Sequence, residues 1–404
     1  MNESGRTATV VLVVGGRVVG ALPPVSLAMP WWPESADVVA AVRRRHGIDV
    51  TVLRLLTAPS DRQWGGHVAY LAEAEEVPTG SLAPWPGDPL KEEPLRQEWA
   101  RPGGPAVVLR WSQERLAERG IRCTGPAEQM RSWNLSGVWR LPTSAGPVWL
   151  KAVPSFFAHE GAVVDWIGPP TAPEVYAWQP GRVLMAEVPG GANHETRGPG
   201  LEPMVHLLTR LQERSLGRSE ELLELGVPDR RLGVMQGSVE AVVAEQAVGL
   251  GAPDRARVER LVETLPARVA AIDACGLPDT LVHGDFHPGN VAGTVGGYVL
   301  LDWGDSFLGN PLTDELAFTA RLDEQEAARA RGWFASAWRR IVPDAEPERA
   351  ADLLRPVLPL LAAVMYDRFC AGIEPDERVY HQRDVVSMLR RAGDEASRAG
   401  SVAS

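Results

Sequence analysis

One stretch constrains this chain more than any other: LVHGDFHPGNVAGTVGGYVLLDWGD, residues 281–305. It places His283, Asp285, His287 and Asn290 in a short polar segment, and Asp302 then ends the apolar segment GYVLLD. Gly284 and Pro288-Gly289, which lie between these polar residues, are typical of a loop. The glycine-rich residues 293–297 predict a hairpin between Asn290 and Asp302.

Three interpretations of this stretch compete. On a continuous strand, His283, Asp285 and His287 would share a face and hold a metal ion. The glycines and the proline favour a loop instead, and no other closely spaced histidine pair completes a ligand shell. The stretch can also be a structural turn without chemistry. The third interpretation is phosphoryl transfer, which needs a carboxylate base, Mg²⁺ and a lysine on the nucleotide phosphates.

The phosphoryl-transfer interpretation gives each polar residue a task. Asp285 accepts the proton of the acceptor hydroxyl, while the amide oxygen of Asn290 and the carboxylate of Asp302 bind the same Mg²⁺ ion. Mg²⁺ prefers hard oxygen ligands and keeps several waters, so these two side chains suffice beside the phosphates. The predicted cofactors are therefore Mg²⁺ and ATP, with GTP as the alternative nucleotide.

The segments LVHGDFHPGNV and VLLDWGDSFLGNPLTDELA resemble the aminoglycoside phosphotransferase family, relatives of the protein kinases and choline kinases. The resemblance extends from about Gln129 to the C-terminus. It implies that Asp285 is the catalytic base, that Asn290 and Asp302 bind Mg²⁺, and that His283 braces the loop. Asp314 matches an aspartate at the start of the next helix, where an acidic residue also suits the helix dipole, and we treat it as structural.

The same resemblance assigns nucleotide contacts to the segment before the motif. In GPVWLKAVP, Lys151 takes the place of the phosphate-binding lysine, and Glu160 in the following helix is its predicted partner, with Asp165 or Glu174 as alternatives. In VLMAEVPG, the backbone of Glu187 and Val188 would contact the purine.

The loop over the phosphates would be RSWNLSGVW, a departure from a glycine-rich loop because Gly137 is its only glycine. Its expected hydrogen-bond donors to the phosphates are Ser132, Asn134 and Ser136.

The expected fold class is α+β, a bilobal protein-kinase-like fold preceded by a small α/β domain. Residues 111–190 form a β-rich N-lobe, in which WNLSGVWRLPT and GPVWLKAVP predict a hairpin. Residues 191–404 form a helical C-lobe with the catalytic loop and the acceptor site. Residues 77–104, rich in Pro, Gly and Trp, predict a linker before the N-lobe.

Residues 1–110 resemble a Nudix domain in their strand–helix–strand order. The predicted elements are strands at 9–14, 18–22, 51–56 and 67–72 and a helix at 35–46. Laid over the Nudix box, VVAAVRRRHGIDV agrees only at Val42, Gly47 and Ile48, and Arg44 and Arg45 replace the metal-binding glutamates. Arginines do not bind Mg²⁺, so we expect an accessory domain without hydrolase activity. Arg43–Arg45 form either a solvated helix face or a contact for an anionic ligand.

Composition limits the partners. The net charge of −11, with acidic and basic residues mixed, disfavours nucleic acid and anionic membrane surfaces. Cys123, Cys275 and Cys370 form no CxxC pair, which excludes a readable zinc site or disulfide framework. The first residues lack the features of a signal peptide, and the longest apolar run is too short to span a bilayer, so the cytoplasm is expected.

The sequence therefore predicts an ATP-dependent kinase of a small-molecule hydroxyl, such as that of an aminoglycoside, a sugar or an amino alcohol. The alternative is a catalytically silent nucleotide-binding sensor or scaffold, which the glycine-poor loop and the altered Nudix box favour. The acceptor's identity and the oligomeric state are not predicted.

Overall fold

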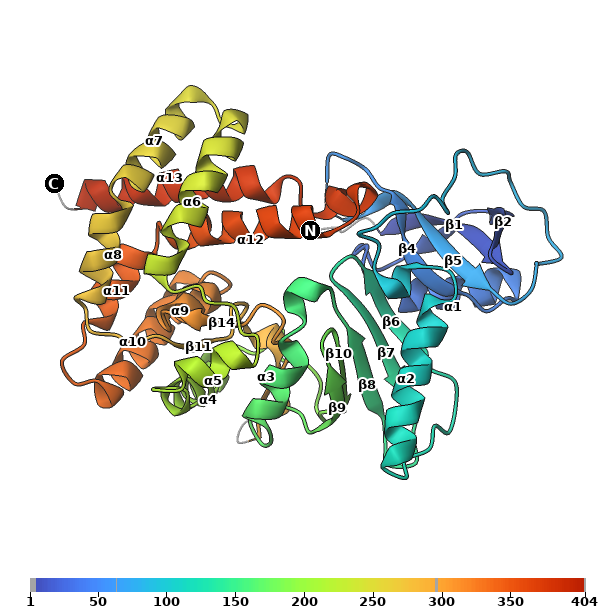
Figure 1. The fold of residues 1–404 in the computed structure, drawn as a ribbon, viewed down its shortest axis with the longest axis horizontal. Helices are drawn as coiled ribbons and strands as arrows, with labels where there is room; N and C mark the ends of the chain where they lie inside the picture. The colour runs from blue at the N-terminus through green and yellow to red at the C-terminus, as the bar shows by residue number, and fades with distance from the viewer. Residues whose placement is uncertain (1–4, 63, 295–296, 403–404) are drawn as a thin grey trace. The chain divides into compact units, whose positions relative to one another are not determined.

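The computed structural model describes residues 5–62, 64–294 and 297–402 (Figure 1). These residues form two compact units, each built from several segments of the chain. The first unit comprises Met1–Phe156, Tyr176–Glu187 and Phe369–Gln382. The second unit comprises Phe157–Val175, Val188–Arg368 and Arg383–Ser404.

The N-terminal sheet of the first unit is mixed. β1 runs parallel to β5 and antiparallel to β2 and β3, while β4 pairs with β5 in the antiparallel sense. Its elements are β1 (Arg6–Val14), β2 (Arg17–Ala21), β3 (Val25–Leu27), α1 (Ala36–His46), β4 (Thr51–Thr57) and β5 (Gly66–Ala74). The four strands and the helix predicted from the sequence are confirmed to within a few residues, and only the short β3 was not predicted.

The second sheet of the first unit has the strand order β6-β7-β8-β10-β9. Its strands are β6 (Glu128–Trp133), β7 (Ser136–Leu141), β8 (Val148–Ala152), β9 (Val175–Gln179) and β10 (Arg182–Ala186). The predicted hairpin is confirmed by the β7–β8 pairing. WNLSGVWRLPT is not one strand, however, because the chain turns at Asn134-Leu135 between β6 and β7.

Helix α2 (Gly104–Glu118) lies along the second sheet (Figure 1). Its Val108 and Leu116 share a core with Trp139 and Leu150 of the sheet. The domain boundary predicted at 110–111 falls inside this helix, and the compact first unit contains both sheets. A side chain joins the sheets: Gln129 of β6 accepts a hydrogen bond from the Val52 backbone N–H and donates one to the Val52 carbonyl, at 2.8 and 2.7 Å.

A late segment of the chain, Phe369–Gln382, belongs to this same unit. Tyr380 joins the core of the N-terminal sheet and packs edge-on against Trp32. The buried Glu374 carboxylate accepts hydrogen bonds from the Arg96 guanidinium at 2.8–3.2 Å. An apolar anchor and a buried ion pair thus fix this segment to residues 278 or more positions earlier in the chain.

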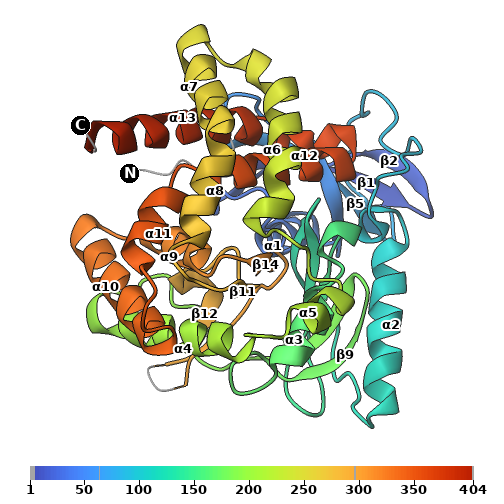
Figure 2. The same cartoon turned by 60° about the vertical axis from the view of Figure 1, so that its left-hand side comes forward.

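The second unit is mainly helical (Figures 1 and 2). Its helices are α3 (Glu160–Ile167), α4 (Leu201–Arg214), α5 (Ser219–Glu224), α6 (Leu232–Gln246), α7 (Ala252–Glu263), α8 (Leu265–Asp273), α9 (Leu312–Thr319), α10 (Glu324–Ile341), α11 (Pro347–Leu354), α12 (Leu358–Gly372, whose last residues belong to the first unit) and α13 (Asp384–Val402). The mainly helical character predicted beyond residue 201 is confirmed.

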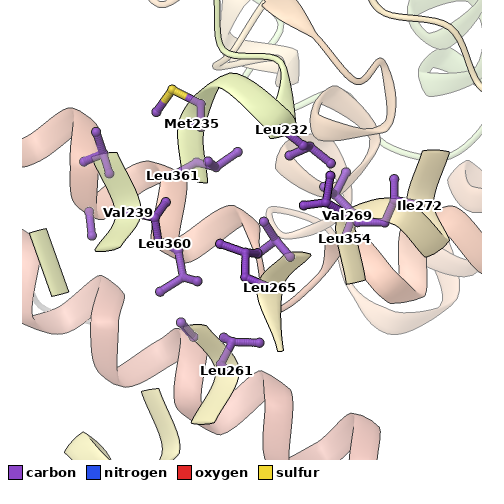
Figure 3. Close-up of a cluster of buried hydrophobic side chains, with 14 of the residues drawn as sticks. Leu232, Met235, Val239, Leu261, Leu265, Val269, Ile272, Leu354, Leu360 and Leu361 are labelled. Carbon is purple, nitrogen blue, oxygen red and sulfur yellow. The ribbon is translucent and has the colours of Figure 1, made fainter. Parts of the chain in front are cut away.

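One large core holds helices α6–α13 together, whereas α3, α4 and α5 belong to a second core. Figure 3 shows Leu261, Leu265 and Val269 from α7 and α8 facing Leu354, Leu360 and Leu361. Residues three or four positions apart on a helix lie on one face, which is why these apolar side chains gather on a single side of each helix. No helix within the described ranges is long and apolar enough to cross a membrane.

Two short antiparallel ladders in the second unit hold the polar motif. β11 (Thr280–Val282) pairs with β14 (Phe307–Gly309), and β12 (Val291–Ala292) pairs with β13 (Val299–Leu300). The β12–β13 pairing confirms the predicted hairpin, although residues 295–296 of its turn lie outside the described residues. The ladders fix both ends of residues 283–290 and bring the residues before Asp302 alongside them.

Candidate active site

The buried carboxylate of Asp314, near the start of α9, anchors the loop at residues 283–290. Its oxygens accept hydrogen bonds from the backbone N–H groups of His283 and Gly284, both at 2.9 Å, and from the Gln212 amide at 3.0 Å. Burial raises the pKa of Asp314 to about 7, although these hydrogen bonds lower it. The structural role predicted for Asp314 thus has a concrete form, since its side chain binds the loop backbone.

Gly284 is required at its position in this loop. Its φ is +88°, and a Cβ atom there would lie 2.3 Å from the backbone oxygen of Asp305. Glycine alone meets both conditions without strain. The glycine between the two polar residues of the motif therefore permits the close approach of the loop to residues 302–306.

His283 links the loop to the second half of the motif. Its ring is fully buried and lies 4.4 Å, between centroids, from that of Trp303. Nδ1 accepts a hydrogen bond from the Asp285 N–H at 3.4 Å, so the proton is on Nε2, which donates to the Leu301 carbonyl at 2.8 Å. Burial lowers the pKa of His283 and keeps the ring neutral. This geometry fits the predicted bracing role.

Asn290 makes the second connection between the two halves. Its side-chain NH₂ donates to the Asp285 carbonyl at 2.9 Å and to the Asp285 carboxylate at 3.2 Å. These contacts turn its amide oxygen away from Asp285. The Asn290 carbonyl accepts a hydrogen bond from the Leu301 N–H at 2.8 Å. Both backbone groups of Leu301 are therefore held by the loop, and the next residue is Asp302.

Asp302 has an unusual backbone. Its φ of 62° makes it the one non-glycine residue with positive φ in the part of the chain that the structure describes. An L-residue other than glycine in this region costs on the order of 1–3 kcal/mol, and such strain is often stored at functional sites. The clamp on Leu301 supplies the contacts that hold the strained residue, whose side chain is exposed.

Asp285 has three side-chain neighbours. Arg321 donates to Oδ1 at 2.9 Å, Asn290 donates to Oδ2, and His287 Nε2 lies 3.4 Å from Oδ2. Burial acts to raise the pKa of Asp285, but the His287 hydrogen bond and the positive charge of Arg321 outweigh it and leave the pKa below its usual range. The carboxylate is ionised at neutral pH, as a proton acceptor must be.

The donor set suits Mg²⁺ better than a transition metal. Within residues 5–62, 64–294 and 297–402, no group of three or more His, Cys, Asp or Glu side chains is placed to hold a metal ion. The rival metal site at His283, Asp285 and His287 is not supported, because His283 is buried and bonded to Leu301. An amide oxygen and a carboxylate, from Asn290 and Asp302, are the hard donors that Mg²⁺ accepts beside phosphates.

The start of α3 packs against the residues that follow Asp302. The His159 ring hydrogen-bonds the Ser306 carbonyl at 3.1 Å, and a Cβ atom on Gly304 would lie 3.5 Å from Oε2 of Glu160. Glu160 is buried, with 1 % of its surface exposed. The predicted partner of Lys151 is therefore a buried acid in contact with the loop that carries Asp302.

Lys151 lies on β8, the central strand of the second sheet, between Val138 of β7 and Val183 of β10. Along β8, Val148, Leu150 and Ala152 are buried in the core, whereas Lys151 is half-buried on the opposite face. Lys151 is therefore not a solvated lysine on an edge strand, because β8 has a neighbouring strand on each side.

The three predicted phosphate donors of the β6–β7 hairpin have other partners. The Ser132 hydroxyl donates to the Leu53 carbonyl at 2.9 Å, and the Ser136 hydroxyl accepts from the Trp133 indole at 2.9 Å. Asn134 donates to the Glu377 carbonyl at 3.2 Å and contacts the His381 ring. All three are buried, so the structure gives their side chains an internal role, and we no longer assign them to the phosphates.

The predicted purine-contacting residues lie at the end of β10. The Glu187 carboxylate accepts two hydrogen bonds from Arg140, at 3.0 and 3.1 Å, and its N–H donates to the Pro147 carbonyl. Val188 is half-buried, and the chain passes from the first unit to the second between these residues. Their predicted nucleotide contact is through the backbone and stays a prediction.

Comparisons with known proteins agree with the motif. Residues 157–355 match the family described as "Phosphotransferase enzyme family". Spectinomycin phosphotransferase, solved with ADP and spectinomycin, is 12% identical, with a TM-score of 0.50 over 72% of this chain and 98% of that chain. The fold is kinase-like. The expected α+β kinase-like fold is thus confirmed for this part of the chain, whereas the Nudix-like nature of the N-terminal region stays a prediction.

Two further solved structures are similar. A macrolide 2'-phosphotransferase from Brachybacterium faecium is 16% identical, with a TM-score of 0.49 over 70% of this chain and 98% of that one. A choline/ethanolamine kinase family protein from Mesorhizobium loti is 18% identical, with a TM-score of 0.46 over 72% and 99%. A search of curated protein sequences found no match.

Some residues of the site carried no signal in the sequence. Gln212 and Arg321 contact Asp314 and Asp285 from distant or irregular segments, and neither belongs to a recognisable motif. The second histidine of the motif, His287, was noted only as a metal ligand, whereas its Nδ1 accepts a hydrogen bond from the Gly289 N–H at 3.0 Å and its Nε2 faces Asp285. Only the folded backbone reveals these contacts.

Proposed function

We propose that this protein is a phosphotransferase that moves the γ-phosphoryl group of ATP, or of GTP, to a hydroxyl group of a small molecule. The observation that carries the proposal is the connection between the two halves of the motif. His283 and Asn290 hold the peptide of Leu301 from both sides, so the carboxylate of Asp285, the amide of Asn290 and the strained Asp302 share one rigid support.

Asn290 and Asp302 would bind Mg²⁺, which when bound neutralises charge on the phosphates. Asp285 orients the acceptor hydroxyl and takes its proton. The acceptor oxygen forms the new bond to the γ-phosphorus, the bond from that phosphorus to the bridging oxygen breaks, and the nucleoside diphosphate leaves. Because the pKa of Asp285 is below its usual range, the base is in the correct protonation state at neutral pH.

For the nucleotide, we propose Lys151 as the phosphate-binding lysine, with Glu160 as its partner, and the backbone of Glu187 and Val188 as the purine contact. The half-buried position of Lys151 on a central strand supports this assignment. The solved spectinomycin phosphotransferase holds ADP, which supports a nucleotide as the donor here. Acceptors of the proposed class include aminoglycosides, sugars and amino alcohols.

We also propose the division of labour expected from the sequence: residues 1–110 as a Nudix-like accessory domain, 111–190 for the nucleotide and 191–404 for the acceptor and catalysis. The absence of hydrolase activity in the first part is supported by Arg43–Arg45, which are exposed on α1 where a Nudix box carries acids. The expected location of the protein in the cytoplasm stays a prediction.

The test is Asp285→Asn. This change keeps the side-chain shape but removes the base, so turnover should fall by about 10²–10⁴-fold, while nucleotide affinity is retained. The measurement is ADP release with a panel of amino sugars, sugars, amino alcohols and nucleosides, beside calorimetric titration with Mg²⁺-ATP. Asp344→Asn, an exposed acid-to-amide change on the second unit, is the matched control.

Two outcomes would contradict the proposal. Full turnover by Asp285→Asn would exclude this residue as the base. Tight binding of Mg²⁺-ATP by the unaltered protein without ADP release from any acceptor would favour the alternative, a nucleotide-binding sensor or scaffold.

A further inference from the structure

The proposed base is capped by an arginine. Oδ2 of Asp285 faces Asn290 and His287, which both belong to the braced loop, whereas Oδ1 accepts its hydrogen bond from Arg321 at 2.9 Å. An acceptor hydroxyl needs one of these oxygens for its proton. Arg321 is the neighbour most easily displaced, because 54% of its side chain is exposed and it lies outside the loop.

The position of Arg321 is tied to the loop through one short helix. Asp314, near the start of α9, binds the loop backbone, and Arg321 follows the end of the same helix, where its N–H donates to the Phe318 carbonyl at 3.2 Å. Phe318 is fully buried and stacks on Phe286 of the loop, with ring centroids 4.8 Å apart. The arginine backbone is thus fixed relative to Asp285, and only its long side chain is free to change partner.

A second arginine supports a site for an anion. Arg230 is only 6% exposed, lies over the Phe307 ring at 5.0 Å, and donates to the Met365 sulfur at 2.6 Å. Its Nε atom is buried with no hydrogen-bond partner, and the Asp305 carboxylate exerts an attractive charge on its guanidinium. A further anionic group beside this buried guanidinium would offset part of the cost of its burial.

Arg230 contacts α12, and Arg321 acts on the same helix electrostatically. Met365 contacts Arg230, and the neighbouring Tyr366 lies within the electrostatic influence of Asp384, Asp305, Asp285 and Arg321. Since Asp305 and Asp384 are also present, the net charge of this region does not indicate which acceptor fits. The direct contact between Arg321 and the proposed base is the observation that indicates the acceptor's charge.

We propose, as an extension of the proposed function, that Arg321 determines acceptor specificity by selecting molecules with a carboxylate or phosphate group near the reacting hydroxyl. The anionic group binds the guanidinium in place of Asp285, and Oδ1 becomes available to the hydroxyl proton. An acceptor that carries only a cation near its hydroxyl displaces Arg321 less readily, so kcat/KM for that acceptor is lower.

The experiment compares matched acceptors in two arms. One arm contains hydroxy acids, sugar acids and sugar phosphates, and the other contains the corresponding amides, amines and neutral sugars. ADP release gives kcat/KM for the unaltered protein, for Arg321→Ala and Arg321→Lys, and for Arg329→Ala, an exposed arginine on α10 that serves as the control. Thermal unfolding and Mg²⁺-ATP titration establish that each variant is folded and binds nucleotide.

The unaltered protein should prefer the anionic arm, and Arg321→Ala should lower kcat/KM in that arm by roughly tenfold or more. The ratio of kcat/KM between the anionic and the other acceptors should therefore become smaller in Arg321→Ala. Arg321→Lys should recover part of this ratio, and Arg329→Ala should leave it unchanged. Equal losses in both arms, or an unchanged preference in Arg321→Ala, would overturn the inference while leaving the proposed function intact. Turnover of amines alone would also overturn the inference and leave the proposed function intact. If no acceptor is turned over, both the inference and the proposed function are overturned.

Discussion

Two polar segments of this chain, the loop at 283–290 and the β6–β7 hairpin at 128–141, use their side chains in opposite ways. In the loop, the buried Asp314, which is not part of the proposed chemistry, binds the N–H groups of His283 and Gly284, and the Asp285 carboxylate remains partly exposed. In the hairpin, Ser132 and Asn134 are themselves the partners of backbone carbonyls elsewhere in the first unit. A buried backbone carbonyl needs a hydrogen-bond partner, and in the hairpin these two polar side chains supply it.

Among the tests of this comparison, substitution of the exposed Asp302 should have the largest effect. Asp302→Asn and Asp302→Gly both remove the proposed metal carboxylate, and each should weaken Mg²⁺-nucleotide binding by at least about tenfold. Glycine tolerates the left-handed backbone without strain, so Asp302→Gly should not be less stable than Asp302→Asn. Calorimetric titration with ADP, with and without Mg²⁺, measures the effect. Equal loss of affinity in the absence of Mg²⁺ would contradict a metal-binding role.

The next effect concerns the buried anchor of the loop. Asp314→Asn leaves one of the two loop N–H groups without an acceptor, which should cost about 1–3 kcal/mol of stability. The cost should depend on pH. Because burial raises the pKa of Asp314 to about 7, well above its value in an unfolded chain, the folded protein binds the proton more tightly. The contribution of Asp314 to the free energy of unfolding is therefore largest at low pH and falls as pH rises towards 7.

Asparagine does not titrate, so the stability gap between the unaltered protein and Asp314→Asn should narrow by roughly 2–3 kcal/mol between pH 5 and pH 7.5. Urea unfolding at both pH values measures it. Glu315 and Glu377, whose pKa values burial also raises, are present in both proteins and cancel in the difference. A gap that stays constant between these pH values would show that Asp314 is ionised throughout.

The smallest expected effect concerns the serines of the β6–β7 hairpin. Ser132→Ala and Ser136→Ala each remove one internal hydrogen bond and should lower the free energy of unfolding by about 1 kcal/mol. Neither should change the affinity for Mg²⁺-ATP, whereas Lys151→Ala, from the same sheet, should weaken it. Denaturant unfolding and nucleotide titration of the three variants test this directly. A clear loss of nucleotide affinity in the serine variants would restore the hairpin as a phosphate-binding loop.

The sequence predicted these two segments unequally for a physical reason. The spacing of Asp285, Asn290 and Asp302 is local, and the hairpin of β12 and β13 that links them is encoded by nearby glycines and apolar residues. The partners of Ser132 and Asn134 lie in β4 and in the segment at 369–382, far away in sequence. No pattern within the hairpin distinguishes a hydroxyl that faces a ligand from one that binds a distant carbonyl.

The same reasoning applies to whole elements. Strands β1, β4, β5 and helix α1 were predicted because their apolar residues alternate or recur at the helical period. Helix α2 was not, because Gly103, Gly104 and Pro105 at its start continue a glycine- and proline-rich stretch that resembles a linker. Gly104 is needed there for packing, since a Cβ atom would lie 1.8 Å from the Glu98 carbonyl.

The late segment Phe369–Gln382 has a consequence for how this polypeptide can be divided. It supplies Tyr380 and Glu374 to the interior of the first unit, yet both of its flanks belong to the second. The N-terminal region is therefore not a detachable module: a fragment ending before residue 369 would expose an apolar cavity and leave Arg96 and Arg54 without their buried counter-charge. A domain exchange that removes the N-terminal region without residues 369–382 would therefore divide the core of the first unit.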